Sequence, residues 1–184
     1  MKITTRDSML VALFTALMIV GAFIRIPFPL LPVTLQAIIC ALSGLILGPR
    51  LAALSMLVYM ILGLTGVPVF ASGGGITYVF NQSFGFILGF IAGAYIIGRL
   101  SLKMNKPTFT GSLKAVMAGL LVLYTIGILY MLFILRIYLG NEQIGLLYVL
   151  SANLPYLIKD VVLFTAAALS STSILPALSK VRTQ

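Results

Sequence analysis

The sequence predicts an all-α integral membrane protein of six transmembrane helices, folded as a single membrane domain over residues 1–184. Of the 184 residues, 61% are hydrophobic and 8% are charged, a composition typical of membrane proteins. A helix needs about 20 mostly apolar residues to cross the hydrocarbon, so a chain of this length holds about six crossings. The net charge of +9 comes from basic residues spread singly between apolar runs, which indicates charges flanking membrane helices rather than a nucleic-acid surface.

Three apolar runs make up the first part of the chain. Residues 9–26 are predicted to be a retained first helix, because no small-residue cleavage site precedes a soluble domain, and a proline-rich stretch then forms a short irregular loop. Residues 33–47 and 51–64 are short for membrane spans. At about 1.5 Å per residue these two runs reach roughly 20 Å, so we expect them either to cross a thin region or to form a re-entrant pair.

A glycine-rich loop separates these runs from the second half. Residues 70–77 contain too much glycine to continue a helix without cost, and helical character resumes at Tyr78 or Ser83 and continues to residue 97. A basic connection then leads to the fifth run, residues 115–138.

The last part of the chain contains a short helix and the final span. Residues 144–150 are predicted as a short interfacial helix. The last span is predicted over residues 153–174, with Pro155 in its first turn, where a proline is tolerated.

Lysine and arginine fix the expected orientation, because cytoplasmic connections carry the excess of basic residues. With both termini cytoplasmic, the outside carries Arg25, Arg136 and Lys159, and the other nine basic residues lie inside. This asymmetry predicts cytoplasmic N- and C-termini. The nine residues are Lys2, Arg6, Arg50, Arg99, Lys103, Lys106, Lys114, Lys180 and Arg182.

Asp160 is the most informative polar residue, because a charge inside the bilayer costs a few kcal/mol and calls for an explanation. One hypothesis is a carboxylate directed into a cavity open to the outside, where it accepts hydrogen bonds from a ligand's N–H groups. The alternative is an ion pair with Lys159 or Arg25 near the outer interface. Arg25 itself either attracts an acidic solute or extends to the interface.

Further polar groups are expected on the same outer side. The glycine-rich loop, with Tyr78 and Asn81, either closes over a polar ligand or is a plain connection. Gln36 either contacts a ligand or satisfies a broken backbone. Together these groups predict a protein that captures a small solute, and a helical scaffold that binds no solute is the alternative.

The missing residue types argue against an enzyme. The chain has no histidine, a single cysteine and only three acidic residues, so aspartic-protease, metalloprotease and haem sites cannot be assembled. A serine nucleophile with a lysine base is left open by composition, but no specific pair of this kind is found on neighbouring spans. Cys40 is expected to be a packing residue. No nucleotide-binding glycine-lysine loop occurs, so we expect no cofactor and no ATP site in this chain. Active uptake would therefore need energy from partners.

Several segments resemble the BioY family, the biotin-specific substrate-capture (S) subunits of energy-coupling factor (ECF) transporters. The resemblance covers most of the chain in the right order. It is carried by Pro-Val-Thr-Leu-Gln at 32–36, Gly-Leu-Ile-Leu-Gly-Pro-Arg at 44–50, Gly-Leu-Thr-Gly-Val-Pro-Val-Phe at 63–70, the glycines 73–75, Gly-Phe-Ile-Leu-Gly-Phe at 85–90, Tyr124, and Pro155 to Asp160.

The resemblance implies a six-helix subunit of a prokaryotic plasma membrane that binds biotin near its outer face, with Asp160 on the ureido N–H groups. It implies as partners a coupling transmembrane subunit, against which Ala12 and Ala16 pack, and two subunits that hydrolyse ATP. The candidate ligand-binding residues, from the polar side chains and the resemblance together, are Arg25, Gln36, Gly73, Gly74, Gly75, Tyr78, Asn81, Tyr156, Lys159 and Asp160.

Two positions depart from the family pattern. Leu163 stands where the family usually has a lysine for the biotin carboxylate, and Lys159 lies about 100° around the helix from Asp160. The usual glycine-proline turn reads Asn81-Gln82-Ser83 here. The expected ligand is therefore biotin with different carboxylate contacts, or a relative such as dethiobiotin.

Overall fold

The computed structural model describes residues 4–27, 31–104, 108–141 and 143–182, with the backbone alone for residues 175–182. Its elements are α1 (Thr5–Phe23), β1 (Arg25–Ile26), β2 (Val33–Thr34), α2 (Gln36–Leu47), α3 (Pro49–Leu64), the 3-10 helix η1 (Ile76–Phe80), α4 (Phe84–Ser101), α5 (Phe109–Phe133), the π-helical segment η2 (Ile134–Tyr138) and α6 (Leu146–Arg182).

The helical membrane class is confirmed. Four helices of the described chain are long and apolar enough to span a membrane, namely α1, α4, α5 with its continuation η2, and α6 up to residue 174. α2 has 12 residues and α3 has 16, so the second and third runs are short, as the sequence predicts. The glycine-rich stretch at 70–77 lies in the connection between α3 and α4, also as predicted.

The helix starts differ from the apolar runs because polar caps extend the helices. The hydroxyl of Thr4 accepts from the backbone N–H of Asp7, while the Asp7 carboxylate accepts from the N–H of Thr4. This reciprocal cap starts α1 at Thr5, before the apolar run. Thr108 caps α5 in a similar way by accepting from the N–H of Gly111, so α5 begins six residues earlier than the apolar residues indicate.

The predicted ends of the first two helical runs are wrong, because Arg25–Ile26 and Val33–Thr34, on either side of the proline-rich stretch, form the strands β1 and β2 of a small hairpin. β1 pairs with β2 in antiparallel register, with Arg25 opposite Thr34 and Ile26 opposite Val33. The residue before a proline is pushed toward extended backbone, which favours the strand conformation of Ile26 before Pro27. Residues 28–30, including Pro29, lie outside the described residues.

The prediction for the last span is wrong at its start. α6 is one continuous helix of 37 residues, roughly 55 Å long at ~1.5 Å per residue, and it includes most of the predicted interfacial helix. Pro155 therefore lies in the helix interior rather than in the first turn. Inside a membrane bundle, neighbouring helices and polar side chains tolerate such a proline.

Close helix packing depends on glycines of α4. A Cβ on Gly89 would lie 2.7 Å from the carbonyl oxygen of Leu123 in α5, and one on Gly93 would lie 3.0 Å from the carbonyl oxygen of Gly119. Small residues at such contacts let membrane helices approach closely. α4 consequently contacts α2, α3 and α5 and forms the centre of the bundle.

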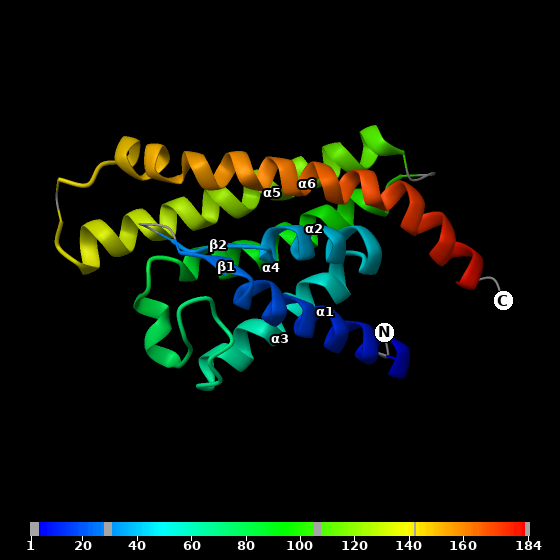
Figure 1. Ribbon diagram of the computed structural model, residues 1–184, viewed down its shortest axis with the longest axis horizontal. Coiled ribbons are helices and arrows are strands. Elements are labelled where there is room, and N and C mark those ends of the chain that lie inside the picture. Colours follow the sequence, from blue (N-terminus) through cyan, green and yellow to red (C-terminus); the bar gives the residue numbers. More distant parts are fainter. Residues whose placement is uncertain (1–3, 28–30, 105–107, 142, 183–184) are drawn as a thin grey trace.

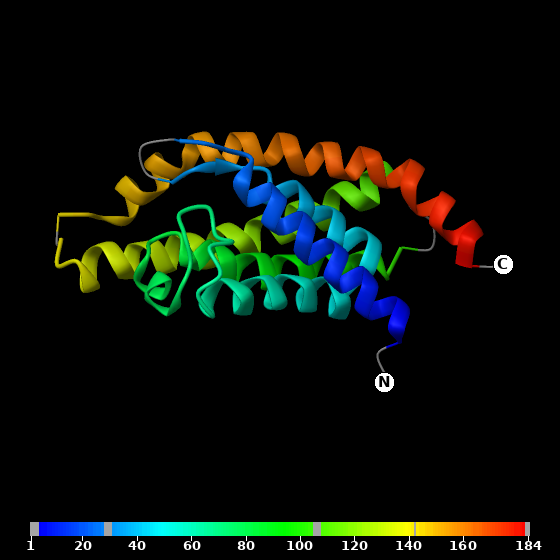
Figure 2. The same ribbon diagram turned by 60° about the horizontal axis from the view of Figure 1, so that its bottom comes forward.

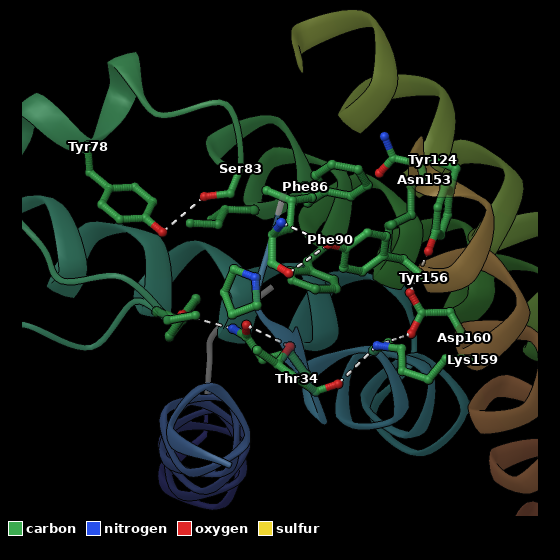
Figure 3. Close-up of a pocket in the computed structure, with 18 residues that line it drawn as sticks. Thr34, Tyr78, Ser83, Phe86, Phe90, Tyr124, Asn153, Tyr156, Lys159 and Asp160 are labelled. Atoms are coloured by element: carbon green, nitrogen blue, oxygen red, sulfur yellow. Dashed lines mark hydrogen bonds and ion pairs between the residues drawn. The ribbon is translucent and has the colours of Figure 1, made fainter. Parts of the chain in front are cut away.

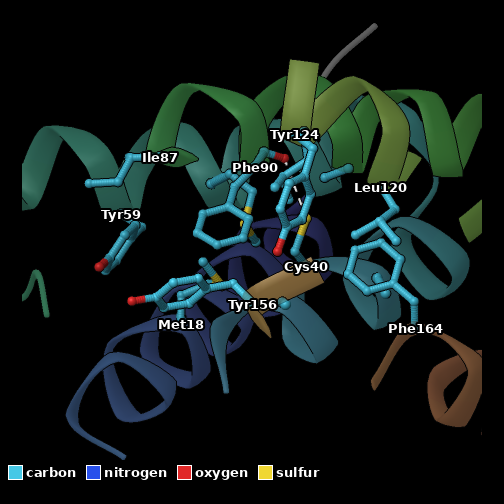
Figure 4. Packing of buried hydrophobic residues seen from close by; sticks show 14 of the residues in the cluster. Met18, Cys40, Tyr59, Ile87, Phe90, Leu120, Tyr124, Tyr156 and Phe164 are labelled. Atoms are coloured by element: carbon cyan, nitrogen blue, oxygen red, sulfur yellow. Dashed lines mark hydrogen bonds between the residues drawn. The ribbon is translucent and has the colours of Figure 1, made fainter. Parts of the chain in front are cut away.

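One end of the bundle differs from the other. The start of α1 and the end of α6 lie together at one end (Figure 1), while the hairpin, the α3–α4 connection and the α5–α6 connection lie toward the opposite end (Figure 2). Between the ends, buried aromatic and aliphatic residues form the core shown in Figure 4. Cys40 is fully buried in this core, which confirms it as a packing residue.

Candidate functional site

A pocket lies at the hairpin end of the bundle, where several elements meet (Figure 3). Its volume is about 630 Å³ when the space open to the outside is included. The lining is mixed, with aromatic and aliphatic side chains beside an acid, a lysine and two amides. The lining residues are Leu31, Pro32, Thr34, Gln36, Ala37, Tyr59, Ala71, Tyr78, Ser83, Phe86, Ile87, Phe90, Leu123, Tyr124, Asn153, Tyr156, Lys159 and Asp160.

Asp160 lines this pocket from α6 and is 7% exposed. Its Oδ2 accepts a hydrogen bond of 2.8 Å from the hydroxyl of Tyr124, and its Oδ1 lies 2.6 Å from Nζ of Lys159. Both sequence hypotheses therefore describe part of the geometry, since the carboxylate faces a cavity and is also paired. Arg25 is exposed on β1 and is absent from the pocket lining.

Lys159 reaches the pocket even though it precedes Asp160 on the helix. Besides the ion pair, its Nζ donates to the backbone carbonyl of Thr34 at 3.0 Å. The long lysine side chain bridges the 100° offset that the sequence indicates. Leu163, in contrast, packs against the hydrophobic core and does not line the pocket.

Tyr156 fastens the hairpin to α6. Its hydroxyl accepts from the backbone N–H of Leu31 and donates to the carbonyl of the same residue, both at 2.8 Å. With the Lys159 contact to Thr34, two side chains of α6 hold the hairpin over the pocket.

Gln36 joins three elements at the pocket wall. Its Nε2 donates to the hydroxyl of Tyr59 at 2.8 Å, and that hydroxyl donates to the carbonyl of Val69 at 3.1 Å. Its Oε1 accepts from the hydroxyl of Thr34 at 3.2 Å. Gln36 thus faces the pocket and also satisfies polar groups of the protein, which combines the two alternatives left open by the sequence.

Tyr78 and Asn81 hold the start of α4 through Ser83. Oδ1 of Asn81 accepts from both the N–H and the hydroxyl of Ser83, at 2.9 and 2.8 Å. Because the single hydroxyl proton of Ser83 is used there, the Tyr78 hydroxyl is the donor in its 3.0 Å contact with Ser83. Tyr78 lines the pocket, whereas Asn81 is absent from the lining.

The three loop glycines shape the backbone rather than line the pocket. Gly73 and Gly75 have φ values of 123° and 100°, which glycine adopts readily, and a Cβ on Gly74 would collide with the carbonyl of Val67. The loop folds around Phe70, which exchanges backbone hydrogen bonds with Gly73 at 2.9 and 3.2 Å. In the described part of this loop, Ala71 is the residue that lines the pocket.

The 3-10 helix η1 at the end of this loop contacts α5 and its continuation η2. The hydroxyl of Tyr130 donates to the carbonyl of Val79. The ring of Phe80 stacks on that of Tyr138, with 4.8 Å between centroids and an interplanar angle of 18°.

Asn153 lines the pocket although no sequence motif singles it out, and Tyr124 is indicated only by the family resemblance. A signal for Asn153 was present, because it lies three residues before Tyr156 and seven before Asp160, a spacing that places all three on one face of a helix. The structure brings these side chains to the same pocket.

Ala12 and Ala16 lie apart from the pocket. Both are exposed on α1, which contacts α2 and α3 through its other residues. Their exposure leaves a strip of small side chains on the outer surface of the bundle.

A pocket with apolar walls and a few buried polar side chains, at one end of a helical membrane bundle, defines a class of membrane protein that binds small solutes. Residues 1–180 match the sequence model of the BioY family, and the chain belongs to this family. It is a multi-pass membrane protein, and the resemblance noted in the sequence is confirmed.

Curated relatives agree with the family. The chain is 40% identical over 140 residues to a "Probable biotin transporter BioY" of Lysinibacillus sphaericus, covering 76% of this chain and 71% of the relative. It is 39% identical over 158 residues to a protein of the same description from Pyrococcus horikoshii, covering 85% and 88%. A "Biotin transporter BioY" of Thermotoga maritima is 38% identical over 130 residues, covering 70% and 73%.

Two solved structures share the fold. The S-component for biotin from an ECF-type ABC transporter has a TM-score of 0.77 at 24% identity, covering 97% of this chain and 92% of that one. The S component of a bacterial ECF transporter has a TM-score of 0.53 at 15% identity, covering 97% and 98%.

Proposed function

We propose that this protein is the biotin-binding subunit of an ECF-type vitamin uptake transporter and captures biotin at the extracellular face of the cell membrane. The observation that carries the proposal is Asp160, a buried carboxylate that lines a pocket at the hairpin end of the bundle. An ionised carboxylate offers about four lone-pair sites. Tyr124 and Lys159 occupy one site on each oxygen, so capacity remains for a ureido N–H.

The apolar part of the pocket suits the rest of such a ligand. Phe86, Ile87, Phe90 and Leu123 line it, and ligand sites typically combine apolar walls with a few well-placed polar groups. These side chains would bury the ring carbons and the aliphatic chain, while the polar groups select the ureido end.

The pocket offers fewer partners for the carboxylate of the ligand than for its ureido group. Among the described residues that line the pocket, Lys159 is the one cation, and it is engaged with Asp160 and Thr34. The proposal therefore includes two ligands of one chemical class, biotin with its carboxylate near the open side of the pocket, and the relative dethiobiotin.

The proposed topology has six transmembrane helices with both termini cytoplasmic, in one membrane domain. In support, both ends of the described chain lie together, away from the hairpin (Figure 1). The excess of lysine and arginine favours the cytoplasm for that end. Two of the nine residues in this argument, Lys2 and Lys106, lie outside the described residues.

The proposed partners are a coupling transmembrane subunit and two subunits that hydrolyse ATP, with no cofactor in this chain. The exposed pair Ala12 and Ala16 supports a partner helix on α1, because small side chains four residues apart allow close helix contact in membranes. The alternative from the sequence is a scaffold that binds no ligand. It requires an apolar, solidly packed interior, and the pocket beside Asp160 disfavours it.

A binding measurement on the purified protein tests the proposal. We expect calorimetry in detergent or nanodiscs to give micromolar or tighter binding of biotin, of dethiobiotin, or of both. The Asp160→Asn substitution should weaken binding by about 1–3 kcal/mol. As a matched control, Ser171→Ala changes a buried polar residue of the same helix that bonds Ser112 rather than the pocket, and it should leave affinity unchanged. Absence of binding for both ligands at micromolar concentration would overturn the ligand assignment.

A further inference from the structure

Asn153 carries a polar atom that the protein leaves without a partner. The residue is 1% exposed and lines the pocket from α6. Its Nδ2 donates to the backbone carbonyl of Val149 at 2.8 Å and approaches the sulfur of Met131 at 3.3 Å. Its Oδ1 is buried and accepts no hydrogen bond, a rare situation for a buried acceptor.

The orientation of this amide is fixed by its surroundings. Exchanging the oxygen and nitrogen would place Oδ1 against the carbonyl oxygen of Val149, two acceptors with no proton between them. The nitrogen must therefore face Val149, and the oxygen is held as an acceptor. Figure 3 draws Asn153 among the pocket residues.

Asn153 and Asp160 form a pair of acceptors on one face of α6. Seven residues separate them, which is about 10 Å along the helix axis at ~1.5 Å per residue, and Tyr156 lies between them on the same face. The two side chains line a single pocket. A ligand lying along this face would meet an acceptor at each end of its contact with α6.

A cyclic urea matches this arrangement. Its two N–H bonds point away from each other, so one carboxylate cannot accept both with good geometry, since hydrogen bonds weaken steeply when bent. We propose that Oδ1 of Asn153 accepts the ureido N–H opposite the one accepted by Asp160. This inference rests on the proposed function and adds a specificity-determining residue to the site.

The test compares biotin with two derivatives that each carry a methyl group on one of the two ureido nitrogens. Their affinities are measured by calorimetry for the wild type, Asn153→Ala and the control Ser171→Ala. We expect Asn153→Ala to bind biotin about tenfold more weakly, and Ser171→Ala to bind like the wild type. One methyl derivative should bind the wild type at least about tenfold more weakly than biotin, yet bind Asn153→Ala as well as biotin does, because alanine leaves room for the methyl group and removes the unpaired acceptor.

The contrary outcomes are distinct. Equal biotin affinity for the wild type and Asn153→Ala would mean that the oxygen is satisfied without the ligand, and it would overturn this inference alone. The same holds if both proteins discriminate identically between the derivatives, because Asn153 would then act only through packing. Failure of the wild type to bind biotin would overturn the biotin assignment and this inference with it. If Asn153→Ala does not fold, the wild type alone decides. A methyl derivative that binds the wild type as tightly as biotin does would show that the methylated nitrogen has no acceptor in the protein, and it would overturn the inference.

Discussion

The hydroxyl of Tyr124 in α5 donates a 2.8 Å hydrogen bond to the carboxylate of Asp160 in α6. The Tyr124 ring is itself held edge-on against Phe86 of α4, with 5.6 Å between the ring centroids. The carboxylate is thus oriented by a side chain that is fixed by a third helix, before any ligand arrives.

Removing the Tyr124 hydroxyl should weaken ligand binding. In Tyr124→Phe the ring packing is kept while Asp160 loses one of its two partners and is held by Lys159 alone, so we expect a loss of about 0.5–1.5 kcal/mol in binding free energy. Calorimetry with biotin checks this. Tyr95→Phe is the matched control, because Tyr95 is 42% exposed on α4 and lies outside the pocket lining. Equal losses in both variants would contradict the orienting role of Tyr124.

The ion pair of Lys159 and Asp160 should be visible in stability. Lys159→Met leaves the buried carboxylate without its cation, and because the lysine side chain is 26% exposed, we expect a loss of only about 1–2 kcal/mol in the free energy of unfolding. The double variant Lys159→Met with Asp160→Asn should recover most of this loss, since no unpaired charge remains. Thermal unfolding in detergent measures both. Lys103→Met, at an exposed position, serves as control, and additive losses in the double variant would show that the pair is not coupled.

Tyr156→Phe should release the hairpin. The substitution removes both hydrogen bonds to the backbone of Leu31, a buried residue. The unpaired N–H and carbonyl should destabilise the docked hairpin by about 1–3 kcal/mol. We expect faster ligand dissociation, measured by chasing bound radiolabelled biotin with excess unlabelled biotin. The control is Tyr148→Phe on the same helix, where the side chain is 53% exposed. An unchanged dissociation rate in Tyr156→Phe would mean that the hairpin does not retain the ligand.

Gly63→Ala should disturb the loop through Phe70. A Cβ on Gly63 would collide with the ring of Phe70, which is 2% exposed and packed between Tyr59 and Tyr78. Overpacking of this kind costs about 1–3 kcal/mol, so a lower melting temperature is expected. Gly145→Ala, which would meet no atom within 4 Å, should melt like the wild type. Equal melting temperatures for the two variants would show that the loop repacks freely.

Hydrophobic run length predicts much of this fold. The four long helices, the two short helices and the glycine-rich connection follow from residue type and spacing alone. A single acid in an apolar span is costly, and that cost correctly points to Asp160 as a residue that faces a cavity.

Features that depend on contacts between distant segments were not predicted. Proline acts locally as a helix breaker, so Pro155 was placed at a helix start, whereas packing against the bundle keeps α6 continuous through it. The hairpin likewise depends on contacts between distant segments, since Tyr156 bonds Leu31 and Lys159 bonds Thr34, and each pair is 125 residues apart. The same local rule places Asn153 at a helix start, whereas in the continuous α6 it lies on the same face as Asp160.

One helix, α6, both holds the hairpin over the pocket and supplies the acidic side chain. Tyr156 and Lys159 bond the hairpin, and Asp160 lies next to Lys159. A tilt or slide of α6 against its neighbours would break the hydrogen bonds to the hairpin and move the carboxylate out of the pocket at the same time. A displacement of α6 at its far end would therefore act on the bound solute through this one helix.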